Sequence, residues 1–337
     1  MIISKTPYRI SFFGGGTDYP IWYLENSGVV LNATINKYSW ITLRNLPKFF
    51  EYKNRVRYHE NETTQSISEI KHPSVRECAR FLGLKNGLDI VHYGDLPGRS
   101  GLGSSSAFTV GLLNAMYSLT KVTKSKLELA KDAINVEQNL IEEHVGSQDQ
   151  VATSVGGFNK IRFKQNGEIT LEPINLHNTD QLYFEKHLLL CFSGQARSAS
   201  EMAKKQIDVT KSKRHELNAL CQLTEQAILA FQQKNISIRD ISEILNEQWK
   251  IKRGITDLVS NEEIDDLYKT GIAAGAYGGK LLGAGGGGFM LFIAPPCKHE
   301  KIKRAIGDRM TVPLKFEYEG SKIVFNSCGH STPQIGI

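Results

Sequence analysis

Cysteine is scarce in this sequence, and its few cysteines show no pairing pattern. Five cysteines are spread over 337 residues, and no two of them form a C-x-x-C pair. An odd number of scattered cysteines is typical of reduced thiols rather than of a disulfide framework. None of the nine histidines stands in an H-E-x-x-H or comparable metal-binding spacing, so the sequence argues against a zinc site.

Long apolar runs are also lacking. The longest, 188–192 and 289–294, have the length of core strands, whereas a membrane-spanning helix needs about 18 apolar residues. Lys5 and Arg9 interrupt the apolar residues at the N-terminus, so we expect no signal peptide. These absences predict a cytoplasmic protein with no membrane partner.

Charge is present but is not concentrated. The sequence has 41 basic and 35 acidic residues, a net charge of +6. This mild excess forms no basic stripe, so we expect no nucleic-acid partner, but it suits anionic ligands. With 40% hydrophobic and 23% charged residues, the chain is neither disordered nor fibrous. Nothing in the sequence indicates the oligomeric state.

The order of predicted elements favours an α+β fold. The length predicts about two domains, and a polar stretch places their boundary near residue 180, which gives domains 1–180 and 181–337. Residues 53–68 are polar and are expected to form a surface excursion. Apolar patterns predict strands at 8–13, 29–43, 88–93, 187–192, 289–294, 313–318 and 322–326, and helices at 74–82, 107–119, 125–145, 199–233, 238–250, 262–274 and 300–306.

The strongest motif is a glycine- and serine-rich segment, 97–106, that leads into a helix. Its glycines allow a ligand to approach the backbone, and its serines are expected to cap the helix. Free N–H groups and the helix dipole would favour an anion there. The glycines have Walker A spacing, but Ser104 stands in place of the lysine. Hydroxyls reaching a metal ion are one interpretation, and an ordinary capped helix after a flexible turn is the other.

A second glycine cluster, 283–288, contains G-x-G-x-x-G at Gly283, Gly285 and Gly288. A dinucleotide site would need a strand before this motif and a helix after it. Because a strand-like run follows instead, we reject the nicotinamide interpretation. The cluster is expected to lie against another loop or a nucleotide, or else to be a purely structural turn.

Two carboxylates follow further glycines. Asp18 comes after Gly14–Gly16, and an ionised carboxylate at that place could accept hydrogen bonds from sugar hydroxyls; a capping role is the alternative. Asp149 lies just after a predicted helix that holds Glu137. It could act as a base toward a hydroxyl, although a carboxylate at such a position, taken alone, is more often a turn or capping residue.

Together these pieces resemble the GHMP kinases, the family of galactokinase, homoserine kinase, mevalonate kinase and phosphomevalonate kinase. Three motifs occur in the family's order: Pro7 to Asp18, Pro97 to Ala107, and Lys280 to Phe289. The G-x-x-D-Q segment at 146–150 resembles the acidic element of the family's sugar kinases. The resemblance implies a domain like ribosomal protein S5 domain 2 followed by a ferredoxin-like domain. It also implies ATP, Mg²⁺ and an active site in the cleft between the domains.

The resemblance also implies roles for single residues. Asp149 would be the catalytic base, and Arg9 would stabilise the attacking oxygen. Ser105 and Glu137 would hold Mg²⁺, with Glu142 and Glu143 as alternative carboxylates because Glu137 lies twelve residues before Asp149. ATP would be bound by the first serine-containing loop: Pro97, Gly98, Gly101, Leu102, Gly103, Ser104, Ser105 and Ser106.

Within the family, the chain most resembles the D-glycero-D-manno-heptose 7-phosphate kinases. Three segments carry this resemblance: Gly14 to Pro20, Glu143 to Gln150, and Phe192 to Ser200. It implies phosphorylation of the anomeric hydroxyl to give the 1,7-bisphosphate, which feeds nucleotide-activated heptose for surface polysaccharide. A second anion site is expected at Arg197, Ser198, Lys204 or Arg99. The implied substrate-binding residues are Gly15, Gly16, Thr17, Asp18, Arg197, Ser198, Gly285 and Gly286.

Two other interpretations stay open. One is a kinase that phosphorylates the anomeric hydroxyl of a different sugar, as fucokinase or galactokinase does. The other is a non-catalytic sensor of sugar and ATP on the same fold, which the presence of Asp149, Arg9 and Ser105 disfavours.

Overall fold

The computed structural model describes residues 1–194 and 199–327. In the N-terminal half its elements are β1 (Ile2–Phe13), α1 (Pro20–Asn26), β2 (Gly28–Asn45), β3 (Asn54–Arg57), β4 (Asn61–Thr64), α2 (Pro73–Phe81), β5 (Leu88–Gly94), α3 (Ser104–Leu119), α4 (Lys126–Asn135), α5 (Gln148–Val155), β6 (Phe158–Phe163) and β7 (Ile169–Pro173). In the C-terminal half they are α6 (Asn178–His187), β8 (Leu188–Phe192), α7 (Ala199–Val209), α8 (Arg214–Phe231), α9 (Ile238–Arg253), α10 (Glu262–Ala274), β9 (Gly278–Leu281), β10 (Phe289–Ile293), α11 (His299–Ile306), β11 (Thr311–Val312) and β12 (Lys322–Asn326).

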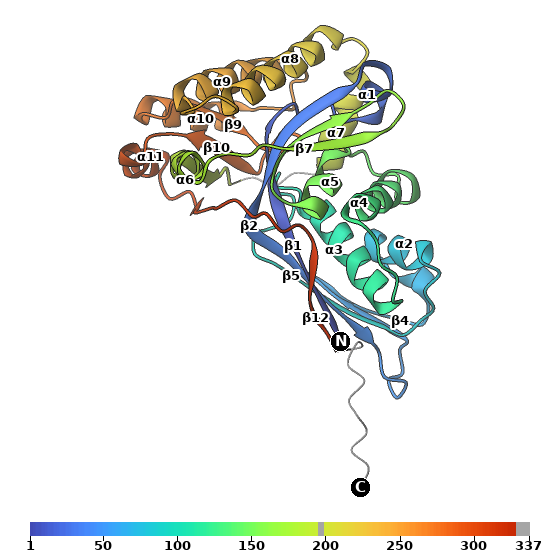
Figure 1. The fold of residues 1–337 in the computed structure, drawn as a ribbon. Coiled ribbons are helices and arrows are strands. Elements are labelled where there is room, and N and C mark those ends of the chain that lie inside the picture. The colour runs from blue at the N-terminus through green and yellow to red at the C-terminus, as the bar shows by residue number, and fades with distance from the viewer. Residues whose placement is uncertain (195–198, 328–337) are drawn as a thin grey trace.

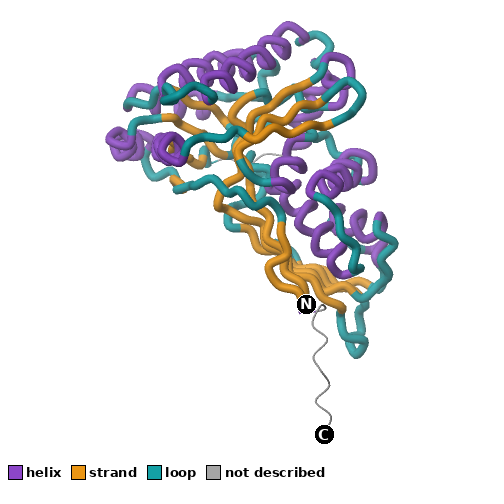
Figure 2. The backbone as a smooth tube through the Cα atoms, in the orientation of Figure 1, coloured by secondary structure: helices purple, strands orange, loops and turns teal. Residues whose placement is uncertain are grey.

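The larger sheet extends from β4 and β12 in the lower part of the molecule up to β7 in the upper part (Figure 1). Its strands run in the order β12-β1-β2-β5-β3-β4, and β6 joins β2 to β7. The helices α2 to α5 cover one face of this sheet (Figure 2). The strands β1 and β2 are rich in β-branched and aromatic residues and are mostly buried, as expected for strands with a helical cover.

The smaller sheet has the order β11-β8-β10-β9 and is antiparallel throughout. Numbered along the chain, its strands stand in the order 4-1-3-2. The helices α7 to α10 connect the first strand to the second, and α11 connects the third to the fourth. This β-α-β-β-α-β arrangement is ferredoxin-like, and it confirms the α+β two-part fold expected from the resemblance.

The end of the described chain returns to the first sheet. The strand β12 pairs antiparallel with β1 and runs beside it in Figure 1. The segment before it is tied to β2 by a bridge between Phe316 and Ile35. The strand predicted at 313–318 was therefore wrong: β11 ends at Val312, and within the predicted range only this bridge forms. A domain boundary near residue 180 stays a prediction.

The two sheets share a hydrophobic core. It includes an aromatic group in which Phe12 and Phe158 of the first sheet contact Phe184 of α6, Phe231 of α8 and Phe316. The rings of Phe184 and Phe231, for example, lie 4.9 Å apart edge to face, a favourable aromatic geometry. This packing holds the loops of the two halves against each other.

Three local expectations were wrong. Residues 54–64 form the paired strands β3 and β4 rather than an irregular excursion, and buried Glu62 accepts hydrogen bonds from the backbone of Lys71 and His72 there. The predicted helix 125–145 ends at Asn135 and continues only as a π-helical turn, Val136–Leu140. The apolar period extends beyond this point, but Glu142 takes a left-handed φ of 60° that breaks the helix. The helical stretch 199–233 divides into α7 and α8.

Candidate active site

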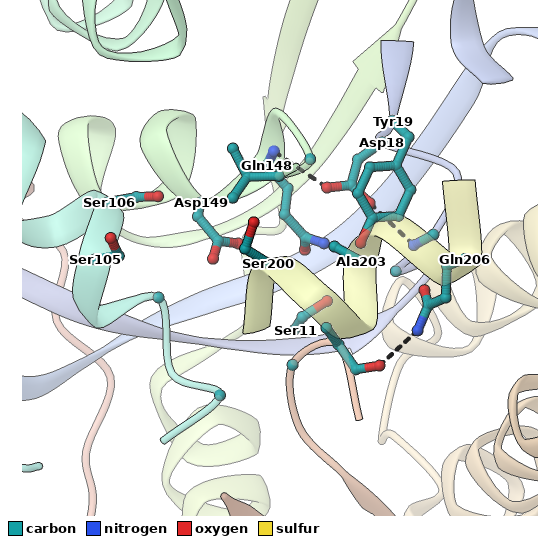
Figure 3. A pocket seen from close by; sticks show the side chains of 18 of the residues that line it. Ser11, Asp18, Tyr19, Ser105, Ser106, Gln148, Asp149, Ser200, Ala203 and Gln206 are labelled. Atoms are coloured by element: carbon teal, nitrogen blue, oxygen red, sulfur yellow. Dashed lines mark hydrogen bonds between the residues drawn. The ribbon is translucent and has the colours of Figure 1, made fainter. Parts of the chain in front are cut away.

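A cavity lies where the two halves meet, and several sequence motifs open onto it. Its walls come from β1 and the loop after it, the start of α3, the segment 143–149, the helix α7 and the loop after β9. Figure 3 looks into this cavity: Ser105 and Ser106 come from α3, Asp149 and Gln148 from α5, and Ser200, Ala203 and Gln206 from α7. Residues far apart in the sequence therefore meet at one place.

The helix α3 begins at the cavity with an uncapped N-terminus. Its N-cap is Gly103, in the left-handed conformation with a φ of 72° and no side-chain capping hydrogen bond. The expectation that a serine caps this helix was wrong, because Ser104, Ser105 and Ser106 already belong to the first helical turn. The N–H groups of a first turn have no intrahelical acceptors, so this end of the helix can bind an anion.

The two glycine loops lie directly against each other. A Cβ on Gly101 would come within 2.5 Å of the Leu282 carbonyl oxygen, and a Cβ on Gly283 within 2.6 Å of the Gly101 Cα. The N–H of Phe289 donates to the Ser100 carbonyl at 3.0 Å. The later loop therefore buttresses the earlier one, which agrees with the expectation that it contacts another loop.

The side chains of Arg9 and Asp149 form a bidentate ion pair at the cavity wall. Arg9 Nε donates to Asp149 Oδ1 at 2.7 Å, and Nη2 donates to Oδ2 at 2.6 Å. The remaining Nη1 donates to the Gly101 carbonyl at 2.8 Å. Arg9 is almost fully buried, whereas about a quarter of the Asp149 side chain, 24%, is exposed. The pair thus fixes Asp149 beside the first glycine loop with its carboxylate facing the cavity.

Asp18 is a second, more deeply buried carboxylate in the same cavity. Its Oδ1 accepts from the Gly16 N–H at 3.0 Å, and its Oδ2 accepts from the Gln148 N–H at 3.4 Å. Burial raises the pKa of Asp18 and the Asp149 charge adds to this, while the Gly16 hydrogen bond and the Lys252 ammonium oppose it. A Cβ on Gly146 would come within 1.9 Å of Asp18 Oδ2, so glycine is required at that position.

Two buried lysines complete this wall. Lys252 of α9 donates to the Gly283 carbonyl at 3.0 Å, and burial lowers its pKa to about 8. Lys280 of β9 donates to the carbonyls of Ser11 and Phe12 at 3.0 and 2.9 Å, and burial lowers its pKa well below the usual range. Both side chains line the cavity.

Glu137 is buried just behind the start of α3. Its Oε2 accepts from Ser106 Oγ at 2.8 Å and from Gln150 Nε2 at 2.5 Å, and its Oε1 has no hydrogen-bond partner among the described residues. Burial raises the pKa of Glu137 to about 7. Of the alternative carboxylates, Glu143 lines the cavity itself, and burial raises its pKa as well.

Of the residues predicted for the site, these line the cavity: Arg9, Gly15, Gly16, Asp18, Gly101, Gly103, Ser104, Ser105, Ser106 and Asp149. Others lie outside the lining. Leu102 is buried in the core, and Thr17 donates to the carbonyls of Gly14 and Val29. Gly285 and Gly286 lie against the backbone of Val259. Pro97 and Gly98, which the structure also describes, do not line the cavity. Arg197 and Ser198 fall outside the described residues.

Sequence reasoning missed Lys252, Gln148 and Gln206. A signal for Lys252 existed, because it continues the buried face of α9 formed by Ile241, Leu245 and Trp249. A lysine at a core position of an amphipathic helix indicates a functional or paired charge. Gln206, which donates to the Ala284 carbonyl at 2.5 Å, has no comparable signal.

Comparisons with known proteins agree with these motifs. Residues 71–157 match the GHMP kinases N terminal domain, and residues 209–311 match the GHMP kinases C terminal domain. The chain is 31% identical to D-glycero-alpha-D-manno-heptose 7-phosphate kinase of Campylobacter jejuni, over 90% of this chain and 93% of that protein. It is 25% identical to galactokinase of Pyrococcus furiosus, over 90% and 92%.

A solved structure shares the fold. The crystal structure of a D-glycero-D-manno-heptose 1-phosphate kinase from Bacteroides thetaiotaomicron superposes with a TM-score of 0.78 at 23% identity, covering 95% of this chain and 98% of that one. Within residues 1–194 and 199–327, no helix has the length and apolar character needed to cross a bilayer.

Proposed function

The chain belongs to the GHMP kinases, and from that premise we propose that it phosphorylates the anomeric hydroxyl of D-glycero-D-manno-heptose 7-phosphate with ATP. The product would be the 1,7-bisphosphate. The observation that carries this proposal is the juxtaposition of two features in one cavity. A carboxylate held by Arg9 lies directly beside the uncapped start of α3, where a Cβ on Gly103 would come within 3.3 Å of Asp149 Oδ2.

The proposed transfer depends mainly on positioning and charge neutralisation, as in other phosphoryl transfers. The N–H groups at the start of α3 bind phosphate oxygens of ATP. Asp149 accepts the proton of the attacking hydroxyl as a general base. Arg9 donates to both carboxylate oxygens of Asp149 and to the Gly101 carbonyl. It thereby holds the base beside the phosphate-binding loop. Asp18 accepts hydrogen bonds from other hydroxyls of the sugar.

The residues near α3 fit a magnesium ion. Hard divalent cations take carboxylate and hydroxyl oxygens as ligands, and the Ser105 hydroxyl lines the cavity. Glu137 is buried close by with one oxygen unpartnered. We propose that Ser105 and Glu137 hold Mg²⁺, with Glu143 as the alternative carboxylate. When bound, the ion would neutralise charge on the phosphates.

A substrate that already carries a phosphate needs a second cationic contact. Of the residues expected to supply it, Arg99 lines the cavity and is exposed, whereas the exposed Lys204 of α7 does not line it. Arg197 lies outside the described residues. We therefore propose Arg99 as the described contact for the 7-phosphate, because its guanidinium can bind phosphate with two hydrogen bonds.

ADP release with Mg-ATP across a panel of acceptors tests the proposal. The panel holds heptose 7-phosphate, unphosphorylated heptose, mannose, fucose and galactose. We expect turnover with the 7-phosphate and little with the free sugars. Turnover with a free hexose instead would support a kinase for another sugar. ATP binding without turnover on any acceptor would contradict the kinase proposal and favour a sensor.

A further inference from the structure

Three donor groups meet beside Gly15 and have no role in the proposed phosphoryl transfer. They come from three elements: Ser11 from β1, Gln148 from α5 and Lys252 from α9. A Cβ placed on Gly15 would lie 3.3 Å from Lys252 Nζ, 3.5 Å from Ser11 Oγ and 3.6 Å from Gln148 Nε2. All three side chains are buried and line the cavity. The missing side chain of residue 15 therefore leaves a small polar recess.

This recess has unused hydrogen-bonding capacity. Lys252 Nζ can donate three hydrogen bonds, and the bond found among the described residues goes to the Gly283 carbonyl. Ser11 Oγ and Gln148 Oε1 have no partner in the described part of the chain. Buried polar atoms without partners cost free energy unless a ligand or water satisfies them. A ligand with several hydroxyls would supply the missing partners.

The charges around the recess restrict the chemical class of ligand that it can bind. Asp18 and Asp149 line the same cavity and act electrostatically on Lys252. No carboxylate in the described residues forms an ion pair with Lys252. A hydroxyl both donates and accepts, so one hydroxyl can donate to Asp18 and accept from Lys252 at the same time. Neighbouring hydroxyls on a sugar ring present this pattern repeatedly.

We propose that Lys252, with Ser11 and Gln148, forms together with Asp18 a receptor for adjacent hydroxyls of the acceptor sugar. Lys252 is then the residue that determines which arrangement of hydroxyls is accepted. This inference rests on the proposed function and identifies the part of the site that recognises the sugar. The phosphate contacts proposed for ATP are at the start of α3 and involve none of these side chains, so the receptor should affect sugar binding and not ATP binding.

Three variants test the proposal by steady-state kinetics. Lys252→Met removes the ammonium, and Gly15→Ala fills the recess at a position where the backbone does not require glycine. Lys250→Met, an exposed position on the same helix, is the matched control. We expect the first two to raise the KM for sugar at least tenfold, with the KM for ATP within about twofold of the wild type. Lys250→Met should change neither.

Deoxy analogues of the accepted sugar locate the contact. If Lys252 donates to one hydroxyl, the penalty of Lys252→Met should disappear for the analogue that lacks this hydroxyl, because the contact is already gone. A uniform penalty across all analogues would overturn the proposal. So would an equal rise of the KM for ATP, which would mean that Lys252 acts by holding the Gly283 loop. A penalty confined to phosphorylated acceptors would show a phosphate contact and would overturn it as well.

The pH dependence gives an independent readout. Lys252 is surrounded by Asp18 after β1, Arg9 on β1, Asp149 on α5 and Lys280 on β9. Because burial lowers the pKa of Lys252 to about 8, the KM for sugar should rise as the pH passes 8. Lys252→Arg, which stays charged, should remove that rise, and an unchanged rise would contradict the assignment.

Failure of the proposed function and failure of this inference can be separated. If the wild type turns over none of the tested acceptors, calorimetric binding of the sugars to wild type and Lys252→Met still measures the receptor. Weaker sugar binding by the variant, with Lys250→Met unaffected, would support the receptor in a non-catalytic protein. Equal sugar binding by wild type and Lys252→Met would overturn it.

Discussion

The two walls of the cavity are built in different ways. The phosphate wall consists of backbone: the glycines 101 and 103, the first turn of α3 and the supporting loop at Gly283. The acceptor wall consists of charged side chains, the buried Arg9, Asp18 and Lys252 and the partly exposed Asp149, from β1, the loop after it, α9 and α5. A backbone wall suits a group common to all nucleoside triphosphates, whereas a side-chain wall can distinguish one hydroxyl from another.

This difference predicts opposite sensitivities. The phosphate wall should lose affinity for ATP when a side chain is added to one of its glycines, because its loops are already in contact. The acceptor wall should fail when functional groups are removed, because it contributes specific donors and acceptors. Substitutions on each wall therefore test whether the two walls differ in this way.

The largest effect is expected on the acceptor wall at Asp149. The variant Asp149→Asn keeps the shape of the side chain but removes the base, so kcat should fall by about 10²- to 10⁴-fold. The KM for ATP should change little, because the start of α3 is untouched. Single-turnover measurements on the folded variant test this, and near-normal turnover would remove Asp149 from the role of base.

A smaller effect is expected on the phosphate wall at Gly101. A methyl group there would meet the Leu282 carbonyl at 2.5 Å, and its φ of +78° is strained for alanine. Gly101→Ala should destabilise the fold by about 1–3 kcal/mol and raise the KM for ATP by roughly tenfold. Gly98, on the same loop, has open space around its Cα, so Gly98→Ala should have a much smaller effect on both the unfolding temperature and the KM. Equal effects of the two variants would contradict contact between the loops.

A third effect, on stability as a function of pH, concerns Glu137, which lies behind the phosphate wall. Burial raises its pKa from 4.5 to about 7, so the folded chain binds more protons than the unfolded chain between these values. Its contribution to stability is therefore present at low pH and is lost as the pH rises toward 7. The free energy of unfolding of wild type should fall by roughly 2–4 kcal/mol over this pH range. Glu137→Gln should not show this fall.

Thermal unfolding of wild type and Glu137→Gln from pH 5 to 8 measures this difference. If Glu137 holds Mg²⁺, adding Mg-ATP should stabilise wild type more at pH 8 than at pH 5.5, since the ion favours the carboxylate. The Gln variant should show no such trend. Parallel pH profiles for the two proteins would contradict the perturbed pKa, and a trend retained in Glu137→Gln would favour Glu143 as the ligand.

The same comparison explains which parts of the site the sequence could predict. The phosphate wall is continuous in sequence, so its glycines and serines stand together as a motif. Asp18 was also predicted, because it follows three glycines, and Asp149 was predicted from the G-x-x-D-Q segment at 146–150. Lys252 and Gln206 lie on helices of the other half, and only the fold brings them to the cavity. The helical pattern of α9 indicates that Lys252 is buried but not which site it faces, because that depends on packing between distant elements.

The elements of the fold also differ in how far the sequence could predict them. Long apolar strands such as β1 and β2 were predicted because their burial is visible in their composition. The strands β3 and β4, at one end of the larger sheet, were missed because they are short and mostly polar. The pairing of β12 with β1 could not be predicted either, since it joins two ends of the chain through the tertiary structure. The early end of the helix predicted at 125–145 was also missed, because the left-handed backbone of Glu142 leaves no mark in the apolar period.

The most direct test of the central claim is ³¹P NMR of the product formed from heptose 7-phosphate and Mg-ATP. We predict two sugar phosphorus signals, one from the original 7-phosphate and a new one coupled to the anomeric proton. Asp149→Asn should produce the new signal far more slowly. A new phosphate on any other carbon, or ADP formation with no new sugar phosphate, would contradict transfer to the anomeric hydroxyl.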